Sequence, residues 1–320
     1  MQLRENNFQK TATLKAVSLQ TGKITTTRSI SLEGMGGTLV SGSWLTYKKG
    51  EDLYVGTTNG SRNIRAAKFT GCVYDSSCLI QAMSFSANGR YLLYSYEGIR
   101  QYDLWTGKTT IFKSSQYYQG YSAGDLYLYM ESYNPDTNRH QIFLTRRSTM
   151  KRTTLLTSKG RPMNDFLFSP TDSTVAWTTG GATNVNTGVT SPTTLGLTTI
   201  ATNSQYKTLS FAGAATITGW LSANSFVVIE TLKPFSAQPT YRFYRVTVAG
   251  GKMTATRFKT ITTRVFTGAS VLNSSTIILL DDSSKKQHYS ILKTDGKVFP
   301  QQTLPAVSGY WYEFAGVKKW

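Results

Sequence analysis

Acidic residues, histidine and cysteine are scarce in this chain of 320 residues. There are 17 Asp and Glu against 35 Lys and Arg, so the formal net charge is +18 at pH 7. The two histidines, His140 and His288, lie far in sequence from the two cysteines, and no set of residues has the spacing of a zinc site. A phosphate-binding Gly-x-x-x-x-Gly-Lys-Ser/Thr loop is absent as well. The sequence therefore predicts no metal and no cofactor.

Long apolar runs and helical periodicity are missing too. No run of 18 apolar residues occurs, so no transmembrane helix is expected within this sequence. No long segment repeats its apolar residues every 3.6 positions, which disfavours an α/β enzyme with a parallel sheet. At the same time 39% of the residues are hydrophobic and 12% are aromatic, which is too many for a disordered chain. What remains is a large protein made of β-strands.

A short phrase recurs along the chain. Its clearest copy, IRQYDLWTGK at residues 99–108, is an alternating strand followed by a Thr-Gly turn. Similar phrases occupy residues 17–23, 244–252 and 290–297, and weaker copies end near residues 71, 149 and 203. The turns lie 36 to 54 residues apart, which is the spacing of four-stranded propeller blades.

A second phrase precedes each of these turns except the first. Its clearest copies are residues 83–94, 166–177 and 219–229, and its last copy is residues 310–317. The unmatched first turn and the unmatched last phrase would form one blade in a closed ring, which removes free sheet edges. We therefore expect residues 1–320 to form a single all-β domain, a seven-bladed β-propeller closed by N-terminal outer strands and C-terminal inner strands in one blade. Six blades is the alternative.

The clearest repeat, FSANGRYLLYSYEGIRQYDLWTGKTT at residues 85–110, resembles the repeat of Tol-B-like propellers. It is also similar to the WD-like propeller domains of prolyl-oligopeptidase-type peptidases. The usual Ser-Pro-Asp-Gly turn of that repeat has its nearest copies in SANG at residues 86–89 and SPTD at residues 169–172. The resemblance implies blade architecture and says little about activity.

One serine lies in a pattern typical of hydrolases, Gly120-x-Ser122-x-Gly124. A nucleophile of that kind needs a strand before it and a helix after it. The residues that follow, DLYLYM at 125–130, have the composition of a strand. We therefore interpret the pattern as a turn between strands and predict no catalytic residue.

The basic residues are scattered in pairs rather than gathered in a tail. The pairs are Lys48-Lys49, Arg146-Arg147, Lys151-Arg152, Lys285-Lys286 and Lys318-Lys319. A positive surface favours acidic partners such as nucleic acid, anionic lipid or acidic wall polymers. An ordinary soluble surface with few acids explains the same imbalance.

Tyrosines are dense in the link between the second and third complete blades. Lys113, Tyr117, Tyr118 and Tyr121 lie there, and long links of this kind often carry binding residues. We predict that these four residues form a ligand-facing patch, in which aromatic faces stack on sugar rings or unpaired bases. The alternative is that the tyrosines pack between blades.

Cys72 and Cys78 are close enough in sequence to close a short loop as a disulfide. Two free thiols in a reducing compartment are the alternative. The disulfide would place the protein outside the cytoplasm, secreted or anchored to the envelope, and would imply that a signal or anchor precedes Met1 in a precursor.

Three functions fit these features. The favoured one is a non-catalytic binding or scaffold propeller outside the cytoplasm, with a protein or an acidic surface polymer as partner. The second is a hydrolase or lyase that acts on a polysaccharide or peptide at the central channel, but the few acids and histidines make a catalytic cluster hard to assemble. The third is a nucleic-acid-binding module, which rests on the net charge alone.

Overall fold

The structure of the protein, a computed structural model, describes 17 segments of the chain. They are residues 2–6, 11–17, 24–31, 40–41, 43–49, 52–68, 81–86, 88–95, 99–112, 118–119, 125–134, 136–159, 163–263, 266–281, 288–299, 302–303 and 312–316. All regular structure in these segments is β-strand, which confirms the predicted all-β class. None of them forms a helix that could span a membrane.

The chain divides into two compact units. Unit 1 comprises Met1–Ser115 and Ala306–Trp320, and its described strands form three antiparallel sheets. The first sheet has the order β29-β1-β2-β3, with strands Tyr312–Gly316, Gln2–Asn6, Thr11–Val17 and Ile24–Ser31. The second has the order β4-β5-β6-β7, with strands Val40–Ser41, Trp44–Lys49, Asp52–Thr57 and Asn63–Ala67. The third has the order β8-β9-β10-β11, with strands Gln81–Phe85, Tyr91–Ser95, Ile99–Asp103 and Thr109–Phe112.

Unit 2 comprises Gln116–Pro305, and its described strands form four sheets. The first joins β12 to β15, which are Tyr118–Gln119, Tyr127–Asn134, Arg139–Arg146 and Arg152–Lys159. The second joins β16 to β19, which are Met163–Phe168, Thr174–Gly180, Thr193–Thr199 and Ser204–Gln205, and β20 (Leu209–Phe211) also pairs with β18. The third joins β21 to β24, which are Ala214–Ser222, Ser225–Leu232, Thr240–Ala249 and Lys252–Thr262. The fourth joins β25 to β28, which are Phe266–Asn273, Thr276–Asp281, His288–Lys293 and Gln302–Thr303.

The two ends of the chain meet in one sheet of unit 1. β29 pairs with β1, with Leu3 opposite Phe314 and Glu5 opposite Tyr312. The prediction gave this sheet a C-terminal pair of strands, whereas its described strands are three from the N-terminal residues and one from the C-terminal residues. The difference arises because only four residues separate β1 from β2, and strands so close in sequence pair readily with each other.

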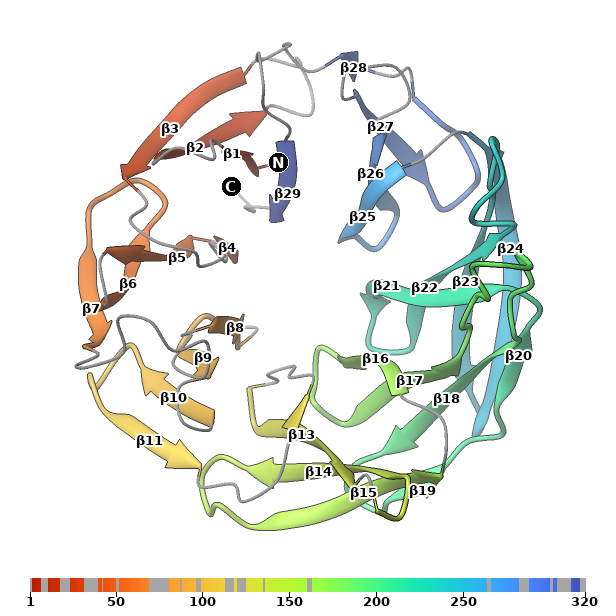
Figure 1. Ribbon diagram of the computed structural model, residues 1–320, viewed down its shortest axis with the longest axis horizontal. Helices are drawn as coiled ribbons and strands as arrows, with labels where there is room; N and C mark the ends of the chain where they lie inside the picture. The colour runs from red at the N-terminus through yellow and green to blue at the C-terminus, as the bar shows by residue number, and fades with distance from the viewer. Residues whose placement is uncertain are drawn as a thin grey trace. The chain divides into compact units, whose positions relative to one another are not determined.

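The middle strands of unit 2 are apolar at consecutive positions because both faces of their sheets are covered. On β22, Phe226 and Val228 pack against the β16–β20 sheet, while Val227 and Ile229 pack toward the β25–β28 sheet. Since successive side chains point to opposite faces of a strand, a strand buried on both sides has no polar alternation. Figure 1 shows the β21–β24 sheet between these two neighbours. Burial on both faces therefore explains the strongly apolar strand in each repeat.

The same stacking recurs between the other described neighbours. In unit 1, Leu53 and Val55 of β6 share an apolar cluster with Leu92 and Tyr94 of β9. In unit 2, Leu144 of β14 packs with Trp177 of β17, and the Trp177 indole lies so close to Gly196 of β18 that any side chain there would overlap it. Each core is thus a layer between two sheets.

Two long loops separate strands of unit 2. Residues 181–192 separate β17 from β18, and their only β-bridge joins Thr183 to Thr190. Residues 233–239, with two prolines, separate β22 from β23. A shorter turn that includes residues 136–138 lies between β13 and β14.

Candidate functional site

A tight turn between β14 and β15, which we call turn 146–151, forms one side of the candidate site. The Arg146 N–H donates to the Lys151 carbonyl at 2.9 Å, and the Met150 N–H donates to the Arg146 carbonyl at 2.8 Å. Met150 has a φ of 56°, the left-handed conformation that closes the turn. This geometry brings Arg146, the last residue of β14, opposite Lys151, the residue directly before β15.

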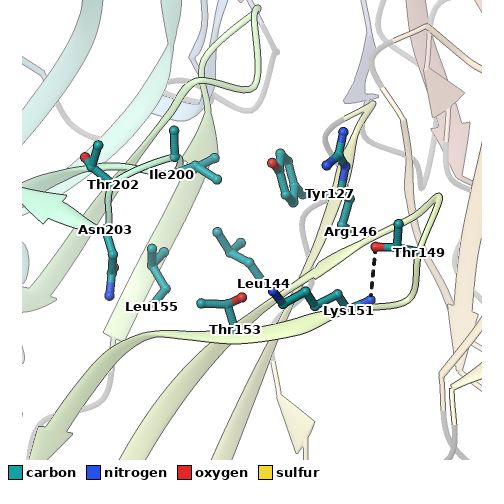
Figure 2. Close-up of a pocket in the computed structure, with 11 residues that line it drawn as sticks. Tyr127, Leu144, Arg146, Thr149, Lys151, Thr153, Leu155, Ile200, Thr202 and Asn203 are labelled. Atoms are coloured by element: carbon teal, nitrogen blue, oxygen red, sulfur yellow. Dashed lines mark hydrogen bonds between the residues drawn. The ribbon is translucent and has the colours of Figure 1, made fainter.

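A pocket of about 410 Å³ opens beside this turn, between the β12–β15 sheet and the β18–β19 turn. We call it the basic pocket; its lining residues are Tyr127, Leu144, Arg146, Thr149, Lys151, Thr153, Leu155, Ile200, Ala201, Thr202 and Asn203. Tyr127 is the cross-strand neighbour of Arg146, and Leu144 is that of Thr153. Figure 2 shows the Lys151 side chain extending toward Leu144 and Thr153.

The basic pocket is apolar at its base and polar at its rim. Leu144 and Leu155 are only 3% and 4% exposed. Arg146, Lys151 and Asn203 are exposed at the rim. Leucine methyl groups below a rim of cations, hydroxyls and an amide form a surface for a ligand with both apolar and anionic parts.

The positive charge of the pocket is not neutralised by a neighbouring acid. Within the described segments, neither Arg146 nor Lys151 forms an ion pair, and no acid lines the pocket. Residues 137–164 contain seven Lys and Arg and no Asp or Glu. Two uncompensated cations on adjacent strand ends attract an anionic ligand.

Asp172 links the two sheets that form the pocket through a hydrogen bond. It lies in the turn between β16 and β17, is 7% exposed and has a φ of 52°. Its carboxylate accepts the Leu126 N–H at 2.5 Å, directly before Tyr127 in the pocket wall. The Leu126 carbonyl in turn accepts the Arg147 N–H at 3.0 Å. Burial raises the pKa of Asp172.

Two further acids of unit 2, the partly buried Asp165 and the buried Glu230, have structural partners. Asp165 accepts hydrogen bonds from the Thr178 hydroxyl at 3.3 Å and from the Ile217 N–H at 3.2 Å, and burial raises its pKa. Glu230, 2% exposed, accepts the Gly213 N–H at 3.0 Å and the Tyr244 hydroxyl at 2.9 Å. Across the described part of the chain, no group of three His, Cys, Asp or Glu is placed to hold a metal ion.

The predicted tyrosine patch falls mostly outside the described residues. Lys113, Tyr117 and Tyr121 lie outside them, and Tyr118 is described only as part of β12, opposite Ser132 of β13. Cys72 and Cys78 also lie outside the described residues, so their disulfide stays a prediction.

The sequence shows the Arg146-Arg147 and Lys151-Arg152 pairs but does not distinguish them from its other basic pairs. The signal that could identify them is the interval of 28 residues without an acid, combined with a turn that brings the two pairs together. The opposite wall, at Ile200 to Asn203, comes from about 50 residues further along the chain and carries no charge by which it could be recognised.

Comparisons with known proteins identify the architecture. No family model matches the chain, and no curated protein matches it. A solved oligogalacturonate lyase in complex with manganese is similar over 92% of this chain and 84% of that chain, with a TM-score of 0.62 and 11% identity. The β-propeller domain of Myceliophteria thermophila Cps50 (Swd1) is similar over 86% of this chain and 89% of its own, with a TM-score of 0.54 and 12% identity.

A prolyl endopeptidase is similar over 92% of this chain but only 48% of its own chain, with a TM-score of 0.55 and 12% identity. Likeness at such identity shows the fold and not the activity. These similar structures include two enzymes and a propeller domain, and they share the propeller architecture. The chain therefore has a β-propeller fold.

Proposed function

We propose that this protein is a non-catalytic, Tol-B-like propeller of seven blades that acts outside the cytoplasm and binds an acidic polymer in the basic pocket. The observation that carries the proposal is the pair Arg146 and Lys151, which have no acidic partner among the described residues and lie above an apolar base. Seven described sheets and the β29–β1 pairing support a closed seven-bladed ring. The location depends on the Cys72–Cys78 disulfide that the sequence predicts.

The pocket favours an extended polymer over a small ion. Its volume of about 410 Å³ lies in the range of ligand-sized clefts, and its rim is open at the exposed residues Arg146, Lys151 and Asn203. The Tyr127 ring beside Arg146 offers a flat surface next to a cation. One polymer unit with a carboxylate, phosphate or sulfate could place its charge between the two cations while neighbouring units extend over the rim.

The test is a salt series of binding measurements with acidic polymers. The panel contains polygalacturonate, a teichoic-type polymer, a sulfated glycan, RNA and DNA, and it is titrated against the wild type and the double variant Arg146→Ala/Lys151→Ala. We expect the wild type to bind at least one polymer. We expect the double variant to bind that polymer more than about tenfold more weakly, with a salt dependence smaller by about two ion equivalents.

The matched control is the double variant Lys252→Ala/Arg257→Ala. Both residues are exposed cations of β24, so this control removes the same charge as the pocket variant from another sheet. Both double variants should leave the melting temperature nearly unchanged. Equal losses of binding in the two double variants would reduce the effect to net charge, and unchanged binding in Arg146→Ala/Lys151→Ala would refute the pocket.

A further inference from the structure

The turn between β10 and β11, which we call turn 103–108, carries the most exposed aromatic ring among the described residues. Trp105 is 69% exposed. Among the other described tryptophans, Trp44 is partly buried, and Trp177 and Trp220 donate their indole N–H groups to the Thr198 hydroxyl at 3.0 Å and the Leu167 carbonyl at 3.4 Å. Within the described segments the Trp105 indole N–H has no such partner, so it is open to a ligand.

The Trp105 ring is held in place by its neighbours. The Asp103 carboxylate accepts the backbone N–H of Trp105 at 2.9 Å and the backbone N–H of Thr106 at 3.3 Å, which fixes the backbone of the turn. Arg90, from the turn before β9, forms an ion pair with Asp103 at 2.7 Å. The same guanidinium lies 4.7 Å from the centre of the Trp105 ring. A ring that is already positioned loses little conformational entropy when it binds.

The turn itself does not need a tryptophan. Among the described residues, three turns share one pair of backbone hydrogen bonds, and their first residues are Asp103, Arg146 and Asn184. The residues that correspond to Trp105 in the other two are Ser148 and Asn186, both exposed and polar. Since small polar residues form the same turn, folding of the turn does not account for a large aromatic at this position.

The surroundings of Trp105 indicate what it binds. Thr106 and Lys108 are exposed and polar, and Arg90 is engaged by Asp103. A protein hot spot is normally enclosed by packed neighbours that exclude water, and single-stranded nucleic acid needs a track of available cations. A sugar ring needs neither: its slightly positive C–H face suits the negative face of an aromatic ring, and its hydroxyls suit a polar rim.

We propose that Trp105 is a stacking site for a pyranose ring of a glycan, with the indole N–H and the exposed polar groups of turn 103–108 bonding to its hydroxyls. This goes beyond the acidic-polymer function. It uses a different sheet, and it recognises the face of a neutral ring rather than a charge. Either proposal can therefore be refuted without affecting the other.

The test is affinity electrophoresis and tryptophan fluorescence with neutral glycans at about 0.5 M NaCl, where binding driven by exposed charges is largely screened. The panel contains soluble cellulose, xylan, mannan, mixed-linkage β-glucan and chitin oligosaccharides. We expect the wild type to bind at least one of them, and Trp105→Ala to bind it at least about tenfold more weakly, the loss typical of removing a stacking aromatic. Trp105→Phe, which keeps a smaller ring, should retain part of the affinity.

Two controls separate this site from others. Ile111→Ala removes another exposed apolar side chain of the same sheet, 49% exposed, and should change nothing. Arg146→Ala/Lys151→Ala should keep neutral-glycan binding even where it loses acidic polymers. The proposal is overturned if no glycan of the panel binds, or if Trp105→Ala binds the glycans as tightly as the wild type does.

Discussion

Turn 103–108 in unit 1 and turn 146–151 in unit 2 share the same pair of backbone hydrogen bonds but begin with residues of opposite charge. In both, the first residue donates its N–H to the sixth residue and accepts the N–H of the fifth. The first residue is Asp103 in one turn and Arg146 in the other. Asp103 bonds to the backbone of its own turn and neutralises Arg90, while Arg146 has no acidic partner among the described residues and lines a pocket.

The two turns differ in whether the side chain of the first residue stabilises the turn or is available to a ligand. Asp103 stabilises its turn through side-chain bonds to two backbone N–H groups, and Asn184 does the same in turn 184–189. Turn 146–151 forms without such bonds from its first residue, so its backbone is held by the strands and by Met150 in a left-handed conformation. The first position is therefore available for a cation at a cost in local stability.

The largest stability effect that tests this comparison is expected for Asp103→Ala. The variant loses two hydrogen bonds to backbone N–H groups and the partner of Arg90, and we expect a loss of about 1.5 kcal/mol in the free energy of unfolding. Urea denaturation measures it. Asp295→Ala is the control, because Asp295 accepts one backbone N–H, that of Lys297, in an exposed turn and should cost less. Equal losses would mean that Asp103 has no special role.

A smaller effect is expected at the fifth position of the two turns. Gly107 has a φ of 71°, and Met150 has a φ of 56°. An added Cβ at Gly107 would meet only the Tyr102 hydroxyl at 3.7 Å, so Gly107→Ala should lose about 1 kcal/mol through backbone strain alone. Met150→Gly removes the same strain and should gain about 0.5 kcal/mol. Thermal unfolding of both variants tests this, and a destabilised Met150→Gly would show that its side chain stabilises the turn.

The smallest effect is expected from the pH dependence of Asp103. The hydrogen bond from Arg90, followed by those from the Trp105 and Thr106 N–H groups, lowers the pKa of Asp103 from 3.8 to about 2. Since the folded-state pKa is depressed, the contribution of Asp103 to stability is complete above the unfolded pKa and is lost as the pH falls through the folded one. The stability gap between the wild type and Asp103→Asn should therefore be constant above about pH 5 and narrow toward about pH 2. A gap that does not change with pH would contradict the ion pair.

Much of the fold was predictable because its signals are local. The Thr-Gly turn at residues 106–107 and the strand at residues 91–95 both have their cause within a few neighbouring residues. The C-terminal strand was assigned to the correct sheet, and the number of N-terminal strands beside it was not. β1 lacks the apolar phrase of the other blades, so only its pairing with β2 identifies it.

The candidate site was less predictable because its parts lack a common motif. Arg146 and Lys151 are visible as basic residues, but many other basic pairs in the sequence look the same. Asp172 matches the repeat turn, yet its bond to Leu126 spans 46 residues and cannot be inferred from either segment alone. The exposure of Trp105 could not be predicted from the sequence either, because another tryptophan of the repeats, Trp177, is buried.

The sequence by itself determined the all-β class, the repeat and several of its turns, because periodicity and turn chemistry act over a few residues. Tertiary structure decided which of the 35 basic residues share a pocket and which aromatic ring faces solvent. The basic pocket exists only where the β12–β15 sheet meets the turn after β18, and its walls lie about 50 residues apart in the chain. Sheet packing sets such distances, because residues remote in sequence become neighbours only when apolar faces are buried against each other.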